Sequence, residues 1–238
     1  MIWLLIIFPV LLAGLIQGLT GFGAVTTIMI FFPSIFPIAK AAGIGGVVMF
    51  AGELALTIHY RRSFKISRVL PALVVYAAVA TWSVHLGDVL DTHILRLMLG
   101  ALLVTLSVYS LYFKRVDNHQ YPWYIALLFM VVSGFFNGLF GIGGPLMAIY
   151  FLSLANSMPE YIVSIQGFFV LDAIYITSIR VSSGILGTQD IPYILVGMLA
   201  GGVGTAIASR LSSRLDLAII KPWIYRFTGL AGFYYLLF

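Results

Sequence analysis

The sequence predicts an all-α polytopic membrane protein with two inverted repeats, each a glycine-broken re-entrant helical hairpin followed by three transmembrane helices. Composition, two charge-free stretches too long for one helix, and a duplicated glycine motif support this prediction. Of the 238 residues, 61% are apolar and 9% are charged, and mean hydropathy is +1.07. Soluble domains carry roughly a quarter charged residues. The composition therefore excludes a cytosolic enzyme and a nucleic-acid reader.

The net charge and the absence of cysteine narrow the function further. A charge of +5 fits the excess of basic residues that membrane proteins carry in cytoplasmic loops. Without cysteine, the chain has no disulfide, thiolate metal site or cysteine nucleophile. The first apolar segment lacks a basic n-region and continues beyond any cleavage site, so we expect it to be mature structure rather than a signal peptide.

A glycine-rich motif occurs twice, half a chain apart. Residues 14–23 (GLIQGLTGFG) match residues 134–143 (GFFNGLFGIG) at an offset of 120, with four glycines and an amide residue in register. Such a match indicates an internal duplication. The amide residues are Gln17 and Asn137, and further pairs at offsets of 119 to 125 are Glu53 with Asp172, Arg61 with Arg180, Pro71 with Pro192, and Arg96 with Lys221.

The duplication divides one transmembrane domain into repeat 1 at residues 1–118 and repeat 2 at residues 119–238. Each repeat opens with a charge-free stretch that would be about 55 Å long as one helix, although the hydrocarbon core is only about 30 Å thick. A break at the glycine motif is therefore expected, giving hairpins at residues 2–36 and 123–156. The following spans are predicted at 41–59, 69–86 and 94–113 in repeat 1, and at 160–180, 191–209 and 218–237 in repeat 2.

The thirteen basic residues test whether the charge-free stretches cross the membrane or turn back. With the basic loop at residues 60–68 in the cytoplasm, crossing stretches place seven basic residues inside and five outside. Hairpins place nine inside and three outside, which agrees better with the positive-inside rule. Each repeat then crosses three times, so the repeats are inverted. Inverted repeats with broken helices meeting at mid-membrane recur in secondary transporters.

The chemistry at the two motifs favours anion binding. Irregular backbone inside a membrane is tolerated where it is buried in protein or lines a wet cavity, and the N-terminus of a half-helix attracts anions. Two such elements would hold a small anion without a buried Lys or Arg. The alternative is that the glycines serve only helix packing or kinks. The predicted substrate-binding residues are Gln17, Thr20, Gly21, Phe22, Gly23, Ala24, Asn137, Gly138, Gly141, Ile142, Gly143, Gly144 and, in a supporting role, Gln166.

Other polar residues fall within or beside the predicted spans. Glu53 and Asp172 are candidate proton-coupling groups, because carboxylates inside a membrane commonly mark a pathway or proton relay; the alternative is a structural pair with a neighbour. Arg61 and Arg180 are expected to be interfacial anchors. No metal site or cofactor is predicted, since the histidines lack metal-ligand spacing. The residues expected at the membrane interface are His59, His85, His93 and His119.

The glycine repeat, the loop at residues 59–68 and the segment at residues 184–190 resemble the TauE/SafE family, also called the sulfite exporter or toluene-sulfonate uptake permease family. The resemblance covers essentially the whole chain and is most specific at residues 138–145. It implies a multi-pass transporter of a bacterial inner membrane or archaeal plasma membrane, for small anions such as sulfite, sulfoacetate or other sulfonates. Residues 23–25 (GAV) differ from residues 143–145 (GGP), so the two sides of the predicted site are not equivalent.

The leading hypothesis is a secondary transporter that holds an anion at mid-membrane and moves it by alternating access. The alternative is a passive anion channel of the same fold. An intramembrane enzyme or a scaffold subunit is a third hypothesis, which the lack of a nucleophile elbow, metal cluster or cofactor motif disfavours. The expected partners are a small anion and the lipid bilayer, with no nucleic acid. Anion identity, direction, coupling ion and homo-oligomerisation stay open at this point.

Overall fold

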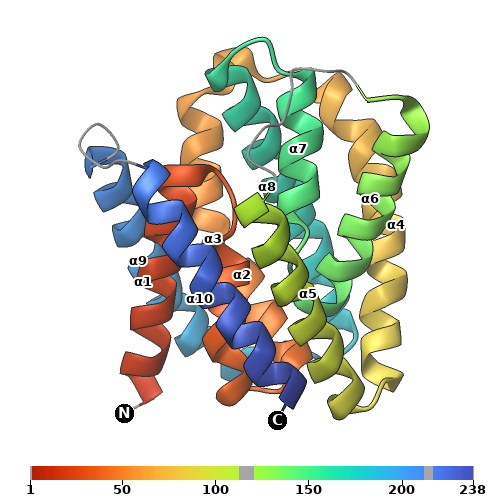
Figure 1. Cartoon of the computed structure of the whole chain (residues 1–238), viewed down its shortest axis with the longest axis vertical. Coiled ribbons are helices and arrows are strands. Elements are labelled where there is room, and N and C mark those ends of the chain that lie inside the picture. The colour runs from red at the N-terminus through yellow and green to blue at the C-terminus, as the bar shows by residue number, and fades with distance from the viewer. Residues whose placement is uncertain (1, 113–120, 212–216, 238) are drawn as a thin grey trace.

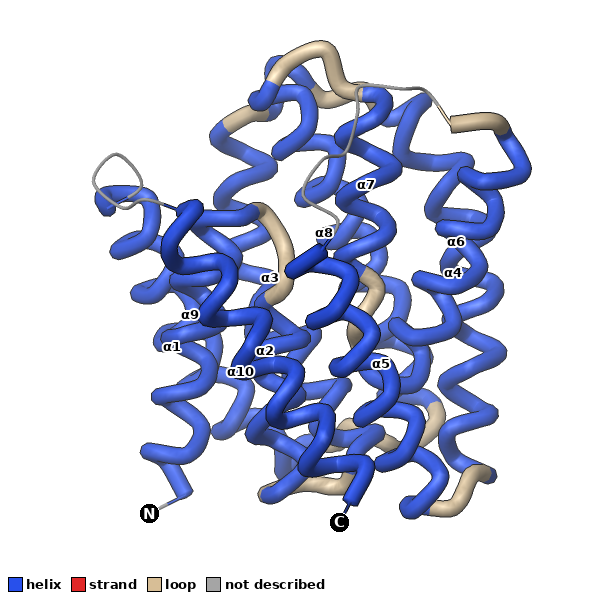
Figure 2. Tube along the Cα trace, in the orientation of Figure 1, coloured by secondary structure: helices blue, strands red, loops and turns tan. Residues whose placement is uncertain are grey.

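The computed structural model describes residues 2–112, 121–211 and 217–237, and within these ranges the protein is helical with no strand (Figure 2). The predicted all-α class is confirmed. Seven of the described helices are long and apolar enough to cross a membrane. The helices are α1 (Ile2–Thr20), α2 (Ala24–Phe31), α3 (Ile38–His59), α4 (Ile66–Val89), α5 (Thr92–Tyr112), α6 (Trp123–Phe140), α7 (Gly144–Leu154), α8 (Met158–Ser182), α9 (Ile191–Leu211) and α10 (Leu217–Leu237), with 3₁₀ turns η1 (Phe32–Ser34), η2 (Arg61–Ser63) and η3 (Thr188–Asp190).

Both predicted helix breaks are present at the glycine motifs. The first separates α1 from α2, and the second separates α6 from α7. Gly21, Gly23 and Gly141 have φ values of 82°, 89° and 69°, a region that side chains with a Cβ atom rarely adopt. Pro145 lies in the first turn of α7, where its missing N–H costs no helical hydrogen bond. The glycines therefore determine where each helix stops.

The two broken helix pairs enter the molecule from opposite ends. In Figure 1, α1 rises from the N-terminus and α2 descends after the first break, whereas α6 descends and α7 rises after the second break. Within each pair the two helices pack against each other. The two breaks are thereby brought into the interior of the helix bundle.

Packing between the helices is the same for the two halves of the chain. The closest neighbours are α1 with α9, α6 with α4, α5 with α10, and α3 with α8, and α3 also contacts α9 as α8 contacts α4. Exchanging each helix for its counterpart in the other half leaves these pairs unchanged. Each broken helix is therefore held mainly by a helix of the opposite half.

Glycines of the duplicated motif allow this close packing. Gly14 and Gly18 face α9, while Gly134 and Gly138 face α4, and a Cβ atom at any of them would collide with atoms of the partner helix. Small residues let helix backbones approach closely in membrane proteins. The packing interpretation is thus confirmed for these four glycines, whereas the later glycines of each motif form the break.

Large apolar side chains cover the outside of the bundle. Leu4, Trp123, Leu199 and Leu230 are among the most exposed, with Leu199 74% exposed. A continuous apolar surface of this kind would be unfavourable in water but suits contact with lipid. Three histidines are exposed near helix ends, namely His59, His85 and His93, and His119 lies outside the described residues.

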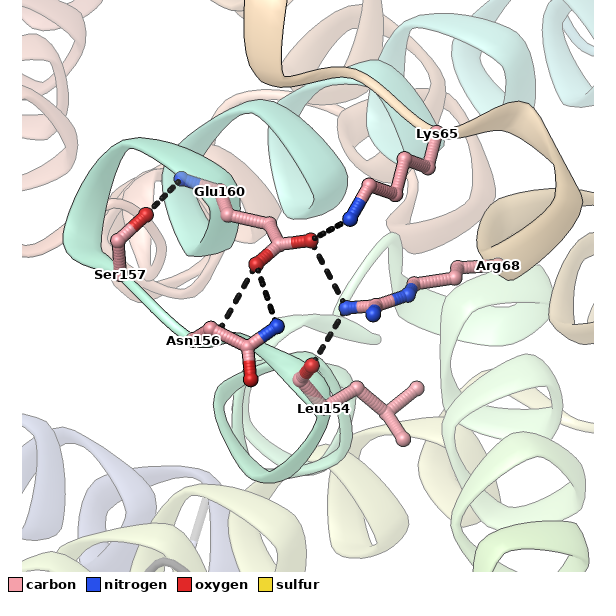
Figure 3. Close-up of polar contacts among 6 residues, drawn as sticks. All are labelled: Lys65, Arg68, Leu154, Asn156, Ser157 and Glu160. Carbon is pink, nitrogen blue, oxygen red and sulfur yellow. Dashed lines mark hydrogen bonds and ion pairs between the residues drawn. The ribbon is translucent and has the colours of Figure 1, made fainter.

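A buried acid and two bases join the two halves at one end of the molecule (Figure 3). Glu160 Oε1 lies 2.9 Å from both Lys65 Nζ and Arg68 Nη1. Glu160 Oε2 accepts hydrogen bonds from the backbone N–H of Asn156 (2.9 Å) and from its side chain (3.1 Å). Arg68 also donates to the carbonyl oxygen of Leu154 at 2.6 Å. The beginning of α8 is thereby held against the beginning of α4.

The opposite end carries a corresponding ion pair with the charges exchanged. Lys40 Nζ, at the beginning of α3, lies 3.1 Å from Asp190 Oδ1 in η3. Lys40 and Glu160 are 120 residues apart and begin corresponding helices, yet one is a base and the other an acid. Ion pairs therefore join the two halves of the chain at both ends of the bundle.

We predict that Gly204→Ala destabilises the protein, whereas Gly202→Ala does not. Both glycines belong to α9, but a Cβ atom at Gly204 would collide with the carbonyl oxygen of Leu11 in α1, and a Cβ atom at Gly202 has no neighbour within 4 Å. Overpacking of this kind costs about 1–3 kcal/mol. Thermal unfolding of the detergent-purified variants measures the difference, and equal melting temperatures would contradict the packing assignment.

Candidate functional site

A cavity lies between the two helix breaks. It is lined by the beginnings of α2 and α7 together with residues of α1, α3, α6 and α8. The predicted site residues that the structure brings together on this lining are Gln17, Phe22, Gly23, Ala24, Glu53, Asn137, Gly141, Ile142, Gly143, Gly144 and Asp172.

Both half-helices begin without a side-chain cap. The N-cap residues of α2 and α7 are Gly23 and Gly143, and neither helix has a side-chain hydrogen bond at its N-terminus. The first N–H groups of a helix have no acceptor within the helix, and the helix dipole places partial positive charge there. The cavity therefore presents two sets of backbone donors suited to an anion.

The other predicted ligands are not among the residues that line this cavity. Thr20 donates from its hydroxyl to the carbonyl oxygens of Ile16 (2.8 Å) and Phe22 (2.6 Å), and so stabilises the first break. Gly21 forms the turn itself, and Gly138 packs against α4. These residues hold the breaks in shape, and a direct ligand role for them stays a prediction.

An amide network connects the first break with α3 and α8. Gln17 Nε2 lies 3.3 Å from Glu53 Oε1 and 3.2 Å from Gln166 Oε1. Gln166 Nε2 in turn donates to the carbonyl oxygen of Gly21 at 2.6 Å. Gln166 therefore satisfies a carbonyl group at the C-terminal end of α1, and it fixes the orientation of the Gln17 amide next to the cavity.

The second break is satisfied by a buried arginine. Arg180 Nη2 donates to the carbonyl oxygens of Asn137 (2.9 Å) and Gly138 (3.1 Å), at the C-terminal end of α6. Its Nη1 donates to the carbonyl oxygen of Ala42 at 3.1 Å. Arg180 is only 2% exposed, so the prediction of an interfacial anchor is wrong for this residue. The reason is that α6 ends inside the protein, where its last carbonyls need donors and its dipole favours a cation.

Two buried carboxyl groups each keep one oxygen without a hydrogen-bond partner. Asp172 accepts from Asn137 Nδ2 through Oδ2 (2.9 Å), but its Oδ1 has no hydrogen-bond partner among the described residues, and the same is true of Glu53 Oε2. The side chains are 5% and 6% exposed. A buried carboxylate without a partner is costly. A proton, or a ligand that donates a hydrogen bond, would therefore stabilise these oxygens.

Sequence reasoning missed two residues next to the cavity. The signal for Arg180 was its place inside an apolar span eight residues after Asp172, where a charge needs a buried partner. Tyr76 of α4 is fully buried, and no described residue forms a hydrogen bond with its hydroxyl. It lies where a Cβ atom of Gly143 would be. No pattern around Tyr76 in the sequence indicates this position.

A comparison with known protein families gives a match over nearly the whole chain. A family model described as "Sulfite exporter TauE/SafE" matches residues 6–235. The chain belongs to the TauE/SafE family. The match spans both breaks and all residues of the cavity, and it confirms the resemblance found in the sequence. No curated protein and no solved structure matches the chain.

Membership of the TauE/SafE family and the apolar helices together determine the general class of protein. The family is a membrane transporter family, and seven of the described helices are long and apolar enough to span a bilayer. The protein is therefore a multi-pass membrane protein of a transporter family, and the family suggests that sulfur-containing anions are its substrates.

We predict that Arg180→Met destabilises the protein strongly, whereas Arg61→Met has little effect. The two arginines occupy corresponding positions in the duplication, but Arg61 is exposed in η2. Removing Arg180 takes away its hydrogen bonds to three buried carbonyl groups, although the carbonyl of Asn137 keeps the N–H of Gly141 as a donor. Each lost hydrogen bond from a charged group costs about 1.5–3 kcal/mol. An exposed substitution changes stability by only about 0.5 kcal/mol. Thermal unfolding of both variants, with similar melting temperatures, would disprove the capping role.

Proposed function

We propose that the protein is a secondary transporter that moves a small sulfur-containing or organic anion, such as sulfite, a sulfonate or sulfoacetate, across the cytoplasmic membrane of a bacterium or archaeon. The observation that carries this proposal is the cavity between two uncapped half-helix N-termini. Its occurrence in a TauE/SafE chain favours a transported anion over a structural ion. The protein acts without a cofactor and without enzymatic chemistry in this proposal.

The anion binds where the first turns of α2 and α7 face the cavity. A sulfonate or sulfite has three oxygens that accept hydrogen bonds, and the backbone N–H groups of the two helices provide donors from two directions. Charge-assisted hydrogen bonds of this kind are about twice as strong as neutral ones. Gln17 and Asn137 line the same cavity and add side-chain amides.

The transmembrane arrangement in this proposal consists of two inverted repeats. The pairs α1–α2 and α6–α7 are re-entrant hairpins, and the other six α-helices cross the bilayer. Two observations support it: the helix pairs enter from opposite ends (Figure 1), and helix packing is unchanged when the halves are exchanged. The breaks then lie near mid-membrane, as in other inverted-repeat transporters.

Alternating access requires that each end of the protein can open while the other stays closed. The Glu160 cluster and the Lys40–Asp190 pair join the halves at opposite ends. Rocking of one half against the other would separate one set of charges and preserve the other. The separated charges would gain water, which offsets much of the lost ion-pair energy.

Gly144→Ala tests the binding site with little risk to the fold. A Cβ atom at Gly144 would lie 3.5 Å from the Cβ of Phe22 and 3.6 Å from the Cζ of Phe169, which are ordinary contacts. The methyl group would still occupy space on the cavity lining. Losing one charge-assisted hydrogen bond costs about 1.5–3 kcal/mol, so we expect affinity for the anion to fall about tenfold or more.

Binding is measured by the thermal shift that sulfite, sulfonates and carboxylates produce in purified protein, and by uptake into proteoliposomes. Gly202→Ala is the control, because a methyl group there meets nothing. Gly143→Val is less informative, since its side chain would collide with Tyr76. Unchanged affinity and uptake in the Gly144 variant would refute binding at the two half-helices.

Proton coupling through Glu53 and Asp172 is part of the proposal. An anion in the cavity adds negative charge beside two carboxyl groups that each keep an unpartnered oxygen. Proton binding by a carboxyl group would remove a like-charge repulsion and supply a donor. The anion and a proton would therefore enter the site together and leave it together.

We expect Glu53→Gln and Asp172→Asn each to abolish anion accumulation driven by an imposed pH gradient, while anion exchange across the membrane continues. Both substitutions preserve shape but remove the proton-binding group. Asp88→Asn, at an exposed position near the end of α4, is the control. Flux in the wild-type protein that ignores the pH gradient and stays unsaturated at high anion concentration would instead favour the passive anion channel.

A further inference from the structure

A second cavity adjoins the first one, with which it shares three lining residues. It lies between the first break, the beginning of α7, and the helices α5 and α10. Among the described residues that line it none is charged, in contrast to the first cavity, which contains Glu53, Asp172 and Arg180. The two cavities therefore offer a ligand very different surroundings.

The walls of the second cavity are largely apolar despite several threonines. Ile16, Leu106 and Pro145 contribute hydrocarbon surface. Thr20 donates its hydroxyl to backbone carbonyls of the first break, and Thr27 donates to the carbonyl oxygen of Gly23 at 3.0 Å. These hydroxyl donors are already used, so the two threonines offer a ligand mainly their methyl groups.

The beginning of α2 forms the boundary between the cavities. Phe22, Gly23 and Thr26 line both of them. Gly23 is the N-cap residue of α2, Phe22 precedes it, and Thr26 lies in the first turn of the helix. An anionic group held by this terminus would therefore have a charged, polar cavity on one side and an uncharged, apolar cavity on the other.

We propose that the second cavity is a subsite for the hydrocarbon part of the substrate, so that the preferred substrate is an organic sulfonate with a short apolar tail rather than inorganic sulfite. This inference rests on the proposed anion site at α2 and α7. The sulfonate head is bound at the helix N-termini, and the tail enters the space beside Ile16, Leu106 and Pro145. The shared wall at Phe22 and Gly23 sets the point where the tail leaves the polar cavity.

A homologous series tests the subsite. Affinities of purified protein are measured for sulfite and for methane-, ethane-, butane- and hexanesulfonate. Burial of each methylene group contributes enough to strengthen binding about fourfold, so the affinity should rise stepwise with chain length until the cavity is full, with sulfite weakest. Hexanol, which has the tail but no anionic head, is the control for nonspecific partition and should not bind.

Two substitutions at Leu106 shift the preferred tail length in opposite directions. Leu106→Phe fills part of the cavity and should weaken hexanesulfonate at least tenfold while sulfite binding changes less than twofold. Leu106→Ala enlarges it and should move the optimum to a longer tail. Leu199→Phe, on the exposed surface of α9, is the matched control for added aromatic surface.

The outcomes separate the subsite from the anion site. Affinity independent of chain length, equal weakening of sulfite and hexanesulfonate by Leu106→Phe, or binding of hexanol as tight as that of hexanesulfonate would overturn the subsite. The last result would assign the cavity to lipid chains. If neither sulfite nor any sulfonate binds, the anion site itself is refuted and the subsite with it.

Discussion

The structure depends on one constraint: a helix that stops inside an apolar bundle leaves backbone polar groups that must find partners. At the C-terminal ends of the broken helices the protein provides them, because Gln166 donates to Gly21 and Arg180 donates to the last carbonyls of α6. At the N-terminal ends no described side chain caps the helix, and both N-cap residues are glycines. The carbonyl groups are thus satisfied by the protein, while N–H groups stay available on the cavity lining. In the proposed mechanism, that difference between the two sides of each break lets the cavity bind a hydrogen-bond acceptor.

Both side chains that satisfy the breaks come from α8, so a symmetric scaffold carries an asymmetric site. The counterpart of α8 is α3, which supplies Glu53 but has Gly46 at the position 120 residues before Gln166. Gly46 lies beside the guanidinium group of Arg180, and a Cβ atom there would make an ordinary contact with Nη1 at 3.6 Å. Of these two helices, α8 thus carries the side chains that satisfy both breaks, whereas α3 contributes a carboxyl group to the cavity. A site of this kind suits a ligand whose two ends differ, because its two sides no longer offer the same groups.

The sequence alone was sufficient for the all-helical class and for the positions of both breaks, since these follow from hydropathy, helix length against bilayer thickness, and the glycines. It also indicated residues such as Gln17, Asn137 and Gly143 that the fold brings together on one cavity, because the duplication marks them. Arg180 could not be assigned in this way. Hydropathy places it at the end of a span, and only the fold puts the end of α6 beside it. The second cavity could not be predicted from the sequence either. Its walls come from α1, α2, α5, α7 and α10, and no periodic pattern connects these segments.

The scarcity of charge in the glycine-rich stretches first suggested that backbone donors, rather than buried cations, attract the anion. Arg180 changes this inference without reversing it, because the guanidinium group donates to three backbone carbonyls, and its charge also counters the dipole of α6. The same cavity holds two carboxyl groups, so its acids outnumber its base. With both carboxyl groups ionised, the side chains would repel an anion on balance. In the proposed mechanism, binding then depends on the half-helix N-termini and on protons that neutralise Glu53 or Asp172, so backbone geometry and proton supply act together.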